Sequence, residues 1–176
     1  MKISIGSIDA MAKKLVAAGF ICRLPRYFER NIVWHHPRLS LVEKGHLLRL
    51  RRAGDRNILT FKKKTPSKSK VHKVREEMEL GVEDFERMEW IFSQLGFSPA
   101  FIYEKYRTVY RKGQTEVMID ETPMGVFIEI EGPAAGIDAT ARRMGYSPAD
   151  YITGSYLSLY RRAGHSGHMV FPEPKG

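Results

Sequence analysis

The sequence predicts an α+β domain in which about eight antiparallel β-strands close into a small barrel, with helices packed on the outside. Three observations predict this fold: an internal repeat, strand-like runs after each copy of the repeat, and charged residues on one face of those runs. With 176 residues, the chain is long enough for one domain with a substantial core.

The internal repeat relates residues 3–20 to residues 80–97, at an offset of 77. Each copy reads as a strand, then an amphipathic helix with apolar residues at i, i+3 and i+7, then a Gly-Phe pair that ends the helix. Ser7 and Asp84 occupy the N-cap positions, where a side-chain oxygen can accept a hydrogen bond from a backbone N–H group. The repeat therefore predicts two similar strand–helix units.

Further strand-like runs follow each copy, and with the two opening strands they bring the total to about eight. They cover Tyr27–Trp34, Leu47–Arg52 and Ile58–Lys63 in the first half, and Ile102–Tyr110, Glu116–Asp120 and Val126–Glu131 in the second. Two more helices are expected at about Ile137–Met144 and Ala149–Arg161. The barrel domain should therefore span residues 1–162, and the Gly-, Pro- and His-containing segment 163–176 should be a disordered tail.

Charged residues share one face of the expected strands, because a strand alternates its faces with period two. In Leu48–Arg51, the leucines lie on one face and the arginines on the other. A sheet with one solvated face would explain any single strand. The helices, however, need apolar sheet surface to cover, so the charged face should line the lumen of the closed barrel. The lumen-facing charges are then Arg49, Arg51, Lys62, Arg75, Lys105, Arg107, Glu77, Glu79, Asp120, Glu129 and Glu131.

A lumen of this kind contributes little stability, because buried ions lose hydration and their pairing only roughly offsets that loss. It suits a wet cavity built for a ligand. Arginine and lysine donate charge-assisted hydrogen bonds to phosphate oxygens, and hard carboxylate oxygens hold Mg²⁺ or Mn²⁺, which bridge substrate phosphates. Both residue classes in one tunnel predict a metal–polyphosphate site. The net charge of +9 fits such a ligand, and fits equally a basic surface that aids solubility.

The order and spacing of several motifs resemble those of the CYTH superfamily, the triphosphate tunnel metalloenzymes. The resemblance covers residues 2 to about 160, and its motifs are L-R-L-R (48–51), L-T-F-K (59–62), K-V-R-E-E-M-E (73–79), Y-E-K-Y-R (103–107), I-D-E-T-P-M-G-V-F-I-E-I-E-G (119–132) and S-Y-L-S-L-Y (155–160). It implies a divalent metal, Mg²⁺ or Mn²⁺, with Glu129 and Glu131 as its ligands. It also implies phosphate-binding roles for Arg49, Arg51, Lys62, Lys105 and Arg107, to which Arg75 is added from the lumen face. The implied catalytic group is Lys2, Glu77, Glu79 and Asp120, near the metal or orienting the basic residues.

The chain departs from the family pattern at its start. The first strand of the family carries Glu-x-Glu-x-Lys, whose glutamates help to hold the metal. Lys2 matches the lysine, and both glutamates would precede Met1. The repeat points the same way, because the second strand includes Lys73–Glu77 before the position that matches the start of this chain. We therefore expect a misassigned start, or else a truncated protein.

Three functions remain open at this point. Attack of water on the terminal phosphorus would make the protein a triphosphatase, whereas attack of the ribose 3′-hydroxyl on the α-phosphorus of ATP would make it a class IV adenylate cyclase. The third function is a non-catalytic module that binds polyphosphate or RNA ends. The expected partner is a small molecule with a triphosphate group, namely tripolyphosphate, ATP or thiamine triphosphate. Nucleic acid is not expected as a partner of the enzyme, and a homodimer stays open.

The expected location is the cytoplasm. The lone cysteine, Cys22, cannot form an internal disulfide, and a reducing compartment suits such a chain. No apolar run approaches the roughly 20 residues of a membrane span, and the first residues do not form a secretory signal.

Overall fold

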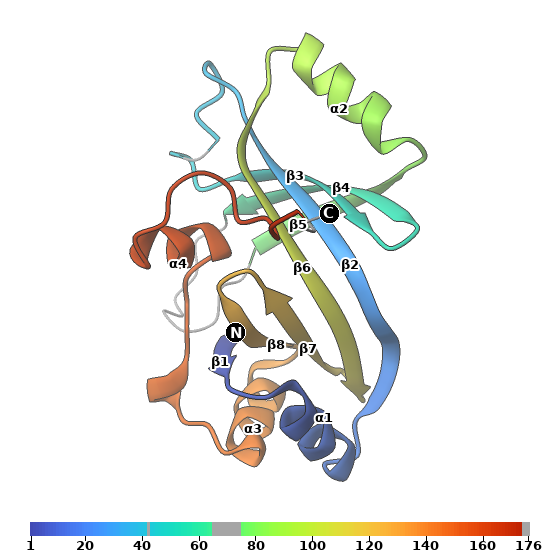
Figure 1. The fold of residues 1–176 in the computed structure, drawn as a ribbon, viewed down its shortest axis with the longest axis vertical. Helices are drawn as coiled ribbons and strands as arrows, with labels where there is room; N and C mark the ends of the chain where they lie inside the picture. Colours follow the sequence, from blue (N-terminus) through green and yellow to red (C-terminus); the bar gives the residue numbers. More distant parts are fainter. Residues whose placement is uncertain (42, 65–74, 174–176) are drawn as a thin grey trace.

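The computed structural model describes residues 1–41, 43–64 and 75–173, with the side chains of residues 64 and 75 left out of the description. Eight antiparallel strands form one strongly curved sheet, and four α-helices and a short 3-10 helix complete the fold (Figure 1). Along the chain, the elements are β1 (Lys2–Ile5), α1 (Ile8–Ala17), β2 (Ile21–His35), β3 (Leu47–Ala53), β4 (Arg56–Lys64), β5 (Arg75–Val82), α2 (Phe85–Gln94), β6 (Ser98–Lys112), β7 (Thr115–Thr122), β8 (Gly125–Glu131), α3 (Ala134–Met144), η1 (Pro148–Asp150) and α4 (Tyr156–Arg162).

The strand order is β1-β8-β7-β6-β2-β3-β4-β5. The opening strand of each repeat therefore pairs with the last strand of the other half: β1 with β8, and β5 with β4. The long strands β2 and β6 join the two halves in the middle of the sheet. Within the described residues no hydrogen-bonded ladder joins β1 to β5, so the wall is a barrel-like sheet with a gap between its edges. The predicted eight-stranded antiparallel tunnel fold is confirmed in this form.

The two repeat helices begin as the sequence predicts. Ser7 Oγ accepts a hydrogen bond from the backbone N–H of Ala10, and an Asp84 carboxylate oxygen accepts one from Arg87. Each helix covers apolar residues on the outer face of the sheet. Because the outer face is apolar where helices cover it, the charged face of the same strands is left to point inward.

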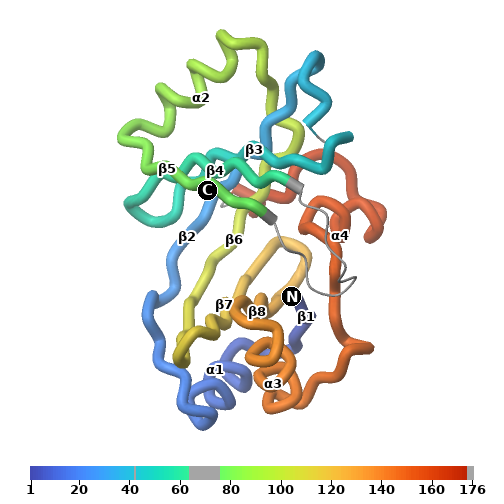
Figure 2. The backbone as a smooth tube through the Cα atoms, turned by 180° about the vertical axis from the view of Figure 1, so that it is seen from behind, coloured from blue at the N-terminus to red at the C-terminus, as the bar shows by residue number. Residues whose placement is uncertain are grey.

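Three hydrophobic clusters make up the core. The first lies under α1 and α3 and includes Leu15, Ile128 and Met144; the second lies under α2 and includes Trp34, Leu50 and Phe92. The third joins α4 to the sheet and includes Phe101, Phe127, Tyr156 and Met169. In the tube of Figure 2, α1 and α3 lie together at one end of the molecule and α2 at the other, with the sheet between them.

The predicted helix Ala149–Arg161 is wrong over its first half. A 3-10 turn at Pro148–Asp150 is followed by extended chain, where Ile152 forms a bridge with Lys2 on the free edge of β1. The helix starts only at Tyr156, after Ser155 caps it through a hydrogen bond from the backbone of Ser158. A glycine and a capping serine therefore divide what reads as one amphipathic segment.

The segment after α4 differs from the expected disordered tail. Met169 is fully buried, its backbone N–H donates to Ile102 O at 2.9 Å, and its carbonyl accepts from Glu104 N at 2.8 Å. These bonds occupy the edge of β6 beyond the point where β7 ends. Residues up to Phe171 therefore lie along the edge of β6. Among the described residues, none of the helices has the length and apolar character needed to cross a membrane.

Candidate functional site

The inner face of the curved sheet encloses a cavity of about 490 Å³. Most of its wall consists of charged side chains and tyrosines from β2 to β8, together with one tyrosine from α4. The lining residues are Arg23, Leu24, Tyr27, Arg49, Arg51, Lys62, Glu77, Glu79, Tyr103, Lys105, Arg107, Val109, Glu116, Met118, Glu129, Glu131 and Tyr156.

The structure brings most of the predicted site residues together. Nine of them line the cavity: Arg49, Arg51, Lys62, Glu77, Glu79, Lys105, Arg107, Glu129 and Glu131. Lys2 and Asp120 are buried behind this lining and bond to members of it. Arg75 lies on β5 opposite Lys64, and its side chain falls outside the described part of the chain.

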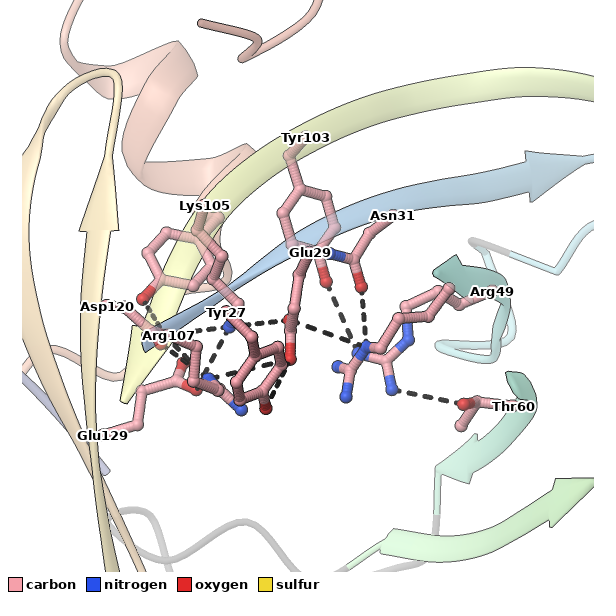
Figure 3. A network of polar contacts seen from close by, with 12 residues as sticks. Tyr27, Glu29, Asn31, Arg49, Thr60, Tyr103, Lys105, Arg107, Asp120 and Glu129 are labelled. Atoms are coloured by element: carbon pink, nitrogen blue, oxygen red, sulfur yellow. Dashed lines mark hydrogen bonds and ion pairs between the residues drawn. The ribbon is translucent and has the colours of Figure 1, made fainter. Parts of the chain in front are cut away.

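Asp120 is the most completely bonded carboxylate of the site and is fully buried. Arg107 donates to both of its oxygens at 2.6 and 2.7 Å, and Lys105 Nζ donates at 2.8 Å (Figure 3). The Tyr156 hydroxyl adds a further hydrogen bond at 2.7 Å. With four hydrogen bonds from three side chains, Asp120 is suited to fixing the directions of Lys105 and Arg107.

Glu129 is an ion-paired carboxylate at the edge of the same network. It accepts hydrogen bonds from Lys2 Nζ at 2.6 Å and from Arg107 Nη2 at 2.5 Å. Burial alone would raise the pKa of Glu129, but the positive charges of Lys105, Lys2 and Arg107 outweigh it and hold the pKa well below its usual range. Glu129 is therefore ionised at neutral pH. Its neighbour on the same face of β8, Glu131, is exposed to the cavity.

Glu29 is the centre of the basic cluster and was missed by the sequence analysis. It is fully buried, and its carboxylate oxygens lie 3.4 Å from Lys105 Nζ, 3.7 Å from Arg51 Nε and 3.9 Å from Arg107 Nε. Burial alone would raise the pKa of Glu29, but the charges of Lys105, Arg107 and Arg51 outweigh this effect and lower the pKa to about 2. Tyr27 donates to Glu29 at 3.1 Å, and burial beside this carboxylate raises the pKa of Tyr27 to about 12.

Strand β3 contributes a pair of arginines to the cavity, Arg49 and Arg51. Arg49 donates to Thr60 Oγ1 at 3.2 Å and to the Tyr103 hydroxyl at 3.4 Å, and Arg51 donates to Asn31 Oδ1 at 2.8 Å. Burial would raise the pKa of the Tyr103 hydroxyl, but the charges of Arg49 and Arg51 outweigh it and lower the pKa. Near the edge strand, Lys62 pairs with Glu77 at 2.7 Å.

Several site residues that the sequence analysis missed share a strand face with other residues of the site. Tyr27, Glu29 and Asn31 alternate along β2 on the face opposite Phe28 and Arg30. Their signal was weak because both faces of β2 carry a mixture of polar and aromatic residues. Tyr103 is two residues before Lys105 on the same face of β6, whereas Tyr156 comes from α4, and nothing local in the sequence indicates its contact with Asp120.

Three buried polar atoms in or behind the cavity wall have no hydrogen-bond partner within the described residues: Glu29 Oε2, Asn31 Nδ2 and Arg49 Nε. Buried polar groups in folded proteins are normally satisfied, so a group of exceptions in one cavity indicates a site made for a polar ligand. A ligand with anionic oxygens in the cavity would meet the arginines that line it.

A divalent cation fits the carboxylates only in combination with another ligand. Within the described residues no three His, Cys, Asp or Glu side chains come together as a metal cluster. Glu129 and Glu131 nevertheless both face the cavity from one strand, and Glu116 lies opposite Glu131 on β7. Mg²⁺ is often bound by one or two carboxylates together with water and substrate phosphates. The donor set is therefore compatible with a cation that arrives with, or is completed by, a phosphate ligand.

The fold and the cavity together define a barrel-like domain with a charged interior. A family model described as "CYTH domain" matches residues 26–156, and this chain belongs to the CYTH domain family. A Methanocaldococcus jannaschii protein named "putative adenylate cyclase" is 30% identical over 170 residues, which cover 90% of this chain and 95% of that protein.

Solved structures agree with this assignment at the level of the fold. A Pyrococcus horikoshii protein superposes with a TM-score of 0.77 at 23% identity, over 92% of this chain and 97% of that one. A Hippeastrum protein, described as a "putative adenylyl cyclase" with a dominant triphosphatase activity, superposes with a TM-score of 0.67 at 16% identity. That match covers 93% of this chain and 94% of the Hippeastrum chain.

Proposed function

We propose that this protein binds the triphosphate group of its substrate in the cavity and, with Mg²⁺ or Mn²⁺, hydrolyses it at the terminal phosphorus. The observation that carries the proposal is the convergence of five basic side chains from three strands on one cavity that also contains Glu129 and Glu131. The basic residues are Arg49 and Arg51 on β3, Lys62 on β4, and Lys105 and Arg107 on β6.

The two groups of basic residues would bind different parts of the phosphate chain. The hydrogen bonds of Arg49 and Arg51 go to neutral partners, Thr60, Tyr103 and Asn31, and a phosphate oxygen is a stronger acceptor than any of these. Their nearest carboxylates, Glu79 and Glu29, lie 3.6 and 3.7 Å away. Lys105 and Arg107 are held in place by Asp120, so their charge is oriented before the substrate binds. Preorganised donors of this kind stabilise the negative charge of a transferring phosphoryl group.

Glu129 and Glu131 would hold the cation at the cavity wall, next to Lys2. When bound, the metal supplies charge neutralisation at the reacting phosphate oxygens. Lys2 donates to Glu129 and its ammonium lies 4.0 Å from the centre of the Tyr156 ring, which fixes the direction of this carboxylate. Glu77 and Glu79, which bond to Lys62 and Thr60, would orient the basic wall from the opposite edge of the sheet.

The second candidate is an adenylate cyclase. It is favoured by the Methanocaldococcus jannaschii relative, whose name gives that activity and which is 30% identical over 95% of its own length. We prefer hydrolysis to cyclisation because hydrolysis needs only bound triphosphate, metal and water. Cyclisation also needs the ribose 3′-hydroxyl to be placed in line with the α-phosphorus.

The test offers tripolyphosphate, thiamine triphosphate and ATP with Mg²⁺ or Mn²⁺ and follows phosphate, pyrophosphate and cyclic AMP. Phosphate release supports the hydrolase, and cyclic AMP with equal pyrophosphate supports the cyclase. Arg49→Ala should lower either activity, whereas Arg52→Ala serves as the matched control, since Arg52 on the same strand pairs with Glu86 outside the cavity. Absence of turnover and of binding for all three substrates would refute the proposal.

A further inference from the structure

Three neighbouring strands carry an apolar row of side chains in an otherwise charged cavity. Leu24 on β2 lies opposite Val109 on β6, and Val109 lies opposite Met118 on β7. All three line the cavity, and they are its only aliphatic lining residues within the described part of the chain. These residues are called the Leu24–Val109–Met118 patch below.

An irregularity in β2 turns Leu24 into the cavity. The pairing of β2 with β6 shifts register on both sides of Leu24, once between Cys22 and Leu24 and once between Leu24 and Tyr27. In a regular strand Leu24 would face away from the cavity that Tyr27 lines, because adjacent side chains alternate. β-Bulges commonly re-aim a side chain next to a functional site. The bulge around Pro25 therefore completes the apolar row.

The patch is not an extension of the hydrophobic core. Val109 and Met118 are buried, yet neither of them belongs to any of the three core clusters of the described residues. Their sequence neighbours, Tyr110 and Val117, point to the other face of the sheet and do belong to the core under α1. The patch is thus apolar surface that faces the cavity.

The patch lies where a group attached to a bound phosphate chain would be expected. The next rung of the same strands holds the pair Arg107 and Asp120, and the patch's own rung continues through Glu129 on β8 to Lys2 on β1. Neighbouring strands lie about 4.8 Å apart, so three strands span about 10 Å, which is the scale of an aromatic ring system. Arg23, Glu116 and Glu131 line the cavity together with the patch and could meet polar groups on the edge of such a ring.

We infer that the Leu24–Val109–Met118 patch binds the aromatic organic group of an organic triphosphate, so that the substrate is an organic triphosphate rather than inorganic tripolyphosphate. This inference rests on the proposed function. A charged lumen alone would bind any triphosphate. The apolar row beside Glu129 adds contact area that only a substrate with an apolar ring can use.

The experiment compares binding of ATP, thiamine triphosphate and tripolyphosphate by isothermal titration calorimetry, with EDTA present to prevent metal-dependent turnover. The variants are Met118→Gln and Leu24→Gln, each checked for an unchanged unfolding transition. Leu24 is 38% exposed, so its substitution is the safer of the two for folding. The matched control is Met78→Gln, because Met78 is an exposed methionine on the outer face of β5.

Both patch variants should weaken binding of at least one organic triphosphate about tenfold, which corresponds to about 1.4 kcal/mol, while tripolyphosphate binding stays within about twofold. Whether ATP or thiamine triphosphate loses more affinity tells which ring the patch accepts. Equal effects on organic and inorganic ligands, or no effect on any, would overturn the inference and leave the triphosphate site standing. If the unaltered protein binds none of the three ligands, the proposed function fails as well.

Discussion

Replacing Glu29 with glutamine tests the electrostatic design of the cavity. The substitution keeps the size of the side chain and its ability to accept a hydrogen bond from Tyr27. Among the described residues, it removes the one negative charge that lies within 4 Å of Lys105, Arg107 and Arg51 at the same time. Because Glu29 is fully buried, water cannot reach this position to solvate the three positive charges. We expect a less stable protein that still folds.

The size of the effect follows from the pKa of Glu29. Folding lowers this pKa from its ordinary value of 4.5 to about 2. Each pKa unit corresponds to about 1.4 kcal/mol, so ionised Glu29 stabilises the folded state by about 3 kcal/mol at neutral pH. Since the folded pKa is lowered, this contribution is complete above about pH 5 and is lost as the pH falls towards 2.

The measurement is urea unfolding of the unaltered protein and of Glu29→Gln at pH 7 and pH 3. The difference in unfolding free energy should be about 3 kcal/mol at pH 7 and about 2 kcal/mol smaller at pH 3. Glu121→Gln is the control, because Glu121 pairs with Arg26, whose side chain is 52% exposed, and an exposed pair contributes under about 1 kcal/mol. A Glu29→Gln protein within about 0.5 kcal/mol of the unaltered one at pH 7 would refute the reasoning.

Three further predictions concern the proposed activity and the network behind it. Glu131→Gln should remove most metal-dependent phosphate release without lowering thermal stability, whereas Glu129→Gln should lower both, because it breaks two partly buried ion pairs. Full activity in Glu131→Gln would contradict the metal assignment. Arg49→Ala should raise the KM for the triphosphate about tenfold to a hundredfold, measured by initial rates, since it removes a charged donor to phosphate; an unchanged KM would argue against this role. Tyr156→Phe should lower the unfolding free energy in urea by about 1 to 2 kcal/mol, because Asp120 loses a buried hydrogen bond of 2.7 Å; a change below about 0.3 kcal/mol would show that the bond contributes nothing net.

The period-two pattern predicted the inner face of the sheet because inner and outer residues differ strongly in most strands. Arg49 and Arg51 alternate with leucines, and Glu129 and Glu131 alternate with isoleucines, so one face of each strand could only be core. The same pattern could not find Glu29, because its neighbours Phe28 and Arg30 give no such contrast. When both faces of a strand carry charged and apolar residues, the pattern does not tell which face is turned inward.

Contacts between distant segments lie beyond any local pattern. The pairing of Lys2 with Glu129 depends on β1 joining the far end of the sheet, and the contact of Tyr156 with Asp120 depends on where α4 docks. The bulge at Pro25 also depends on a distant segment of the chain. A proline in a strand indicates an irregularity, but only the partner strand shows that Leu24 turns inward.

The pairing of β1 with β8 also constrains how the protein is made. Lys2 and Glu129 are partners in the ladder although 127 residues separate them in the chain. At about 5 to 20 residues per second, a ribosome needs roughly 6 to 25 s to synthesise that separation. Throughout this interval Ile3 and Ile5, both buried in the finished protein, have no sheet to join. β1 is therefore synthesised long before its partner strand, and during that interval it is open to chaperones and to aggregation.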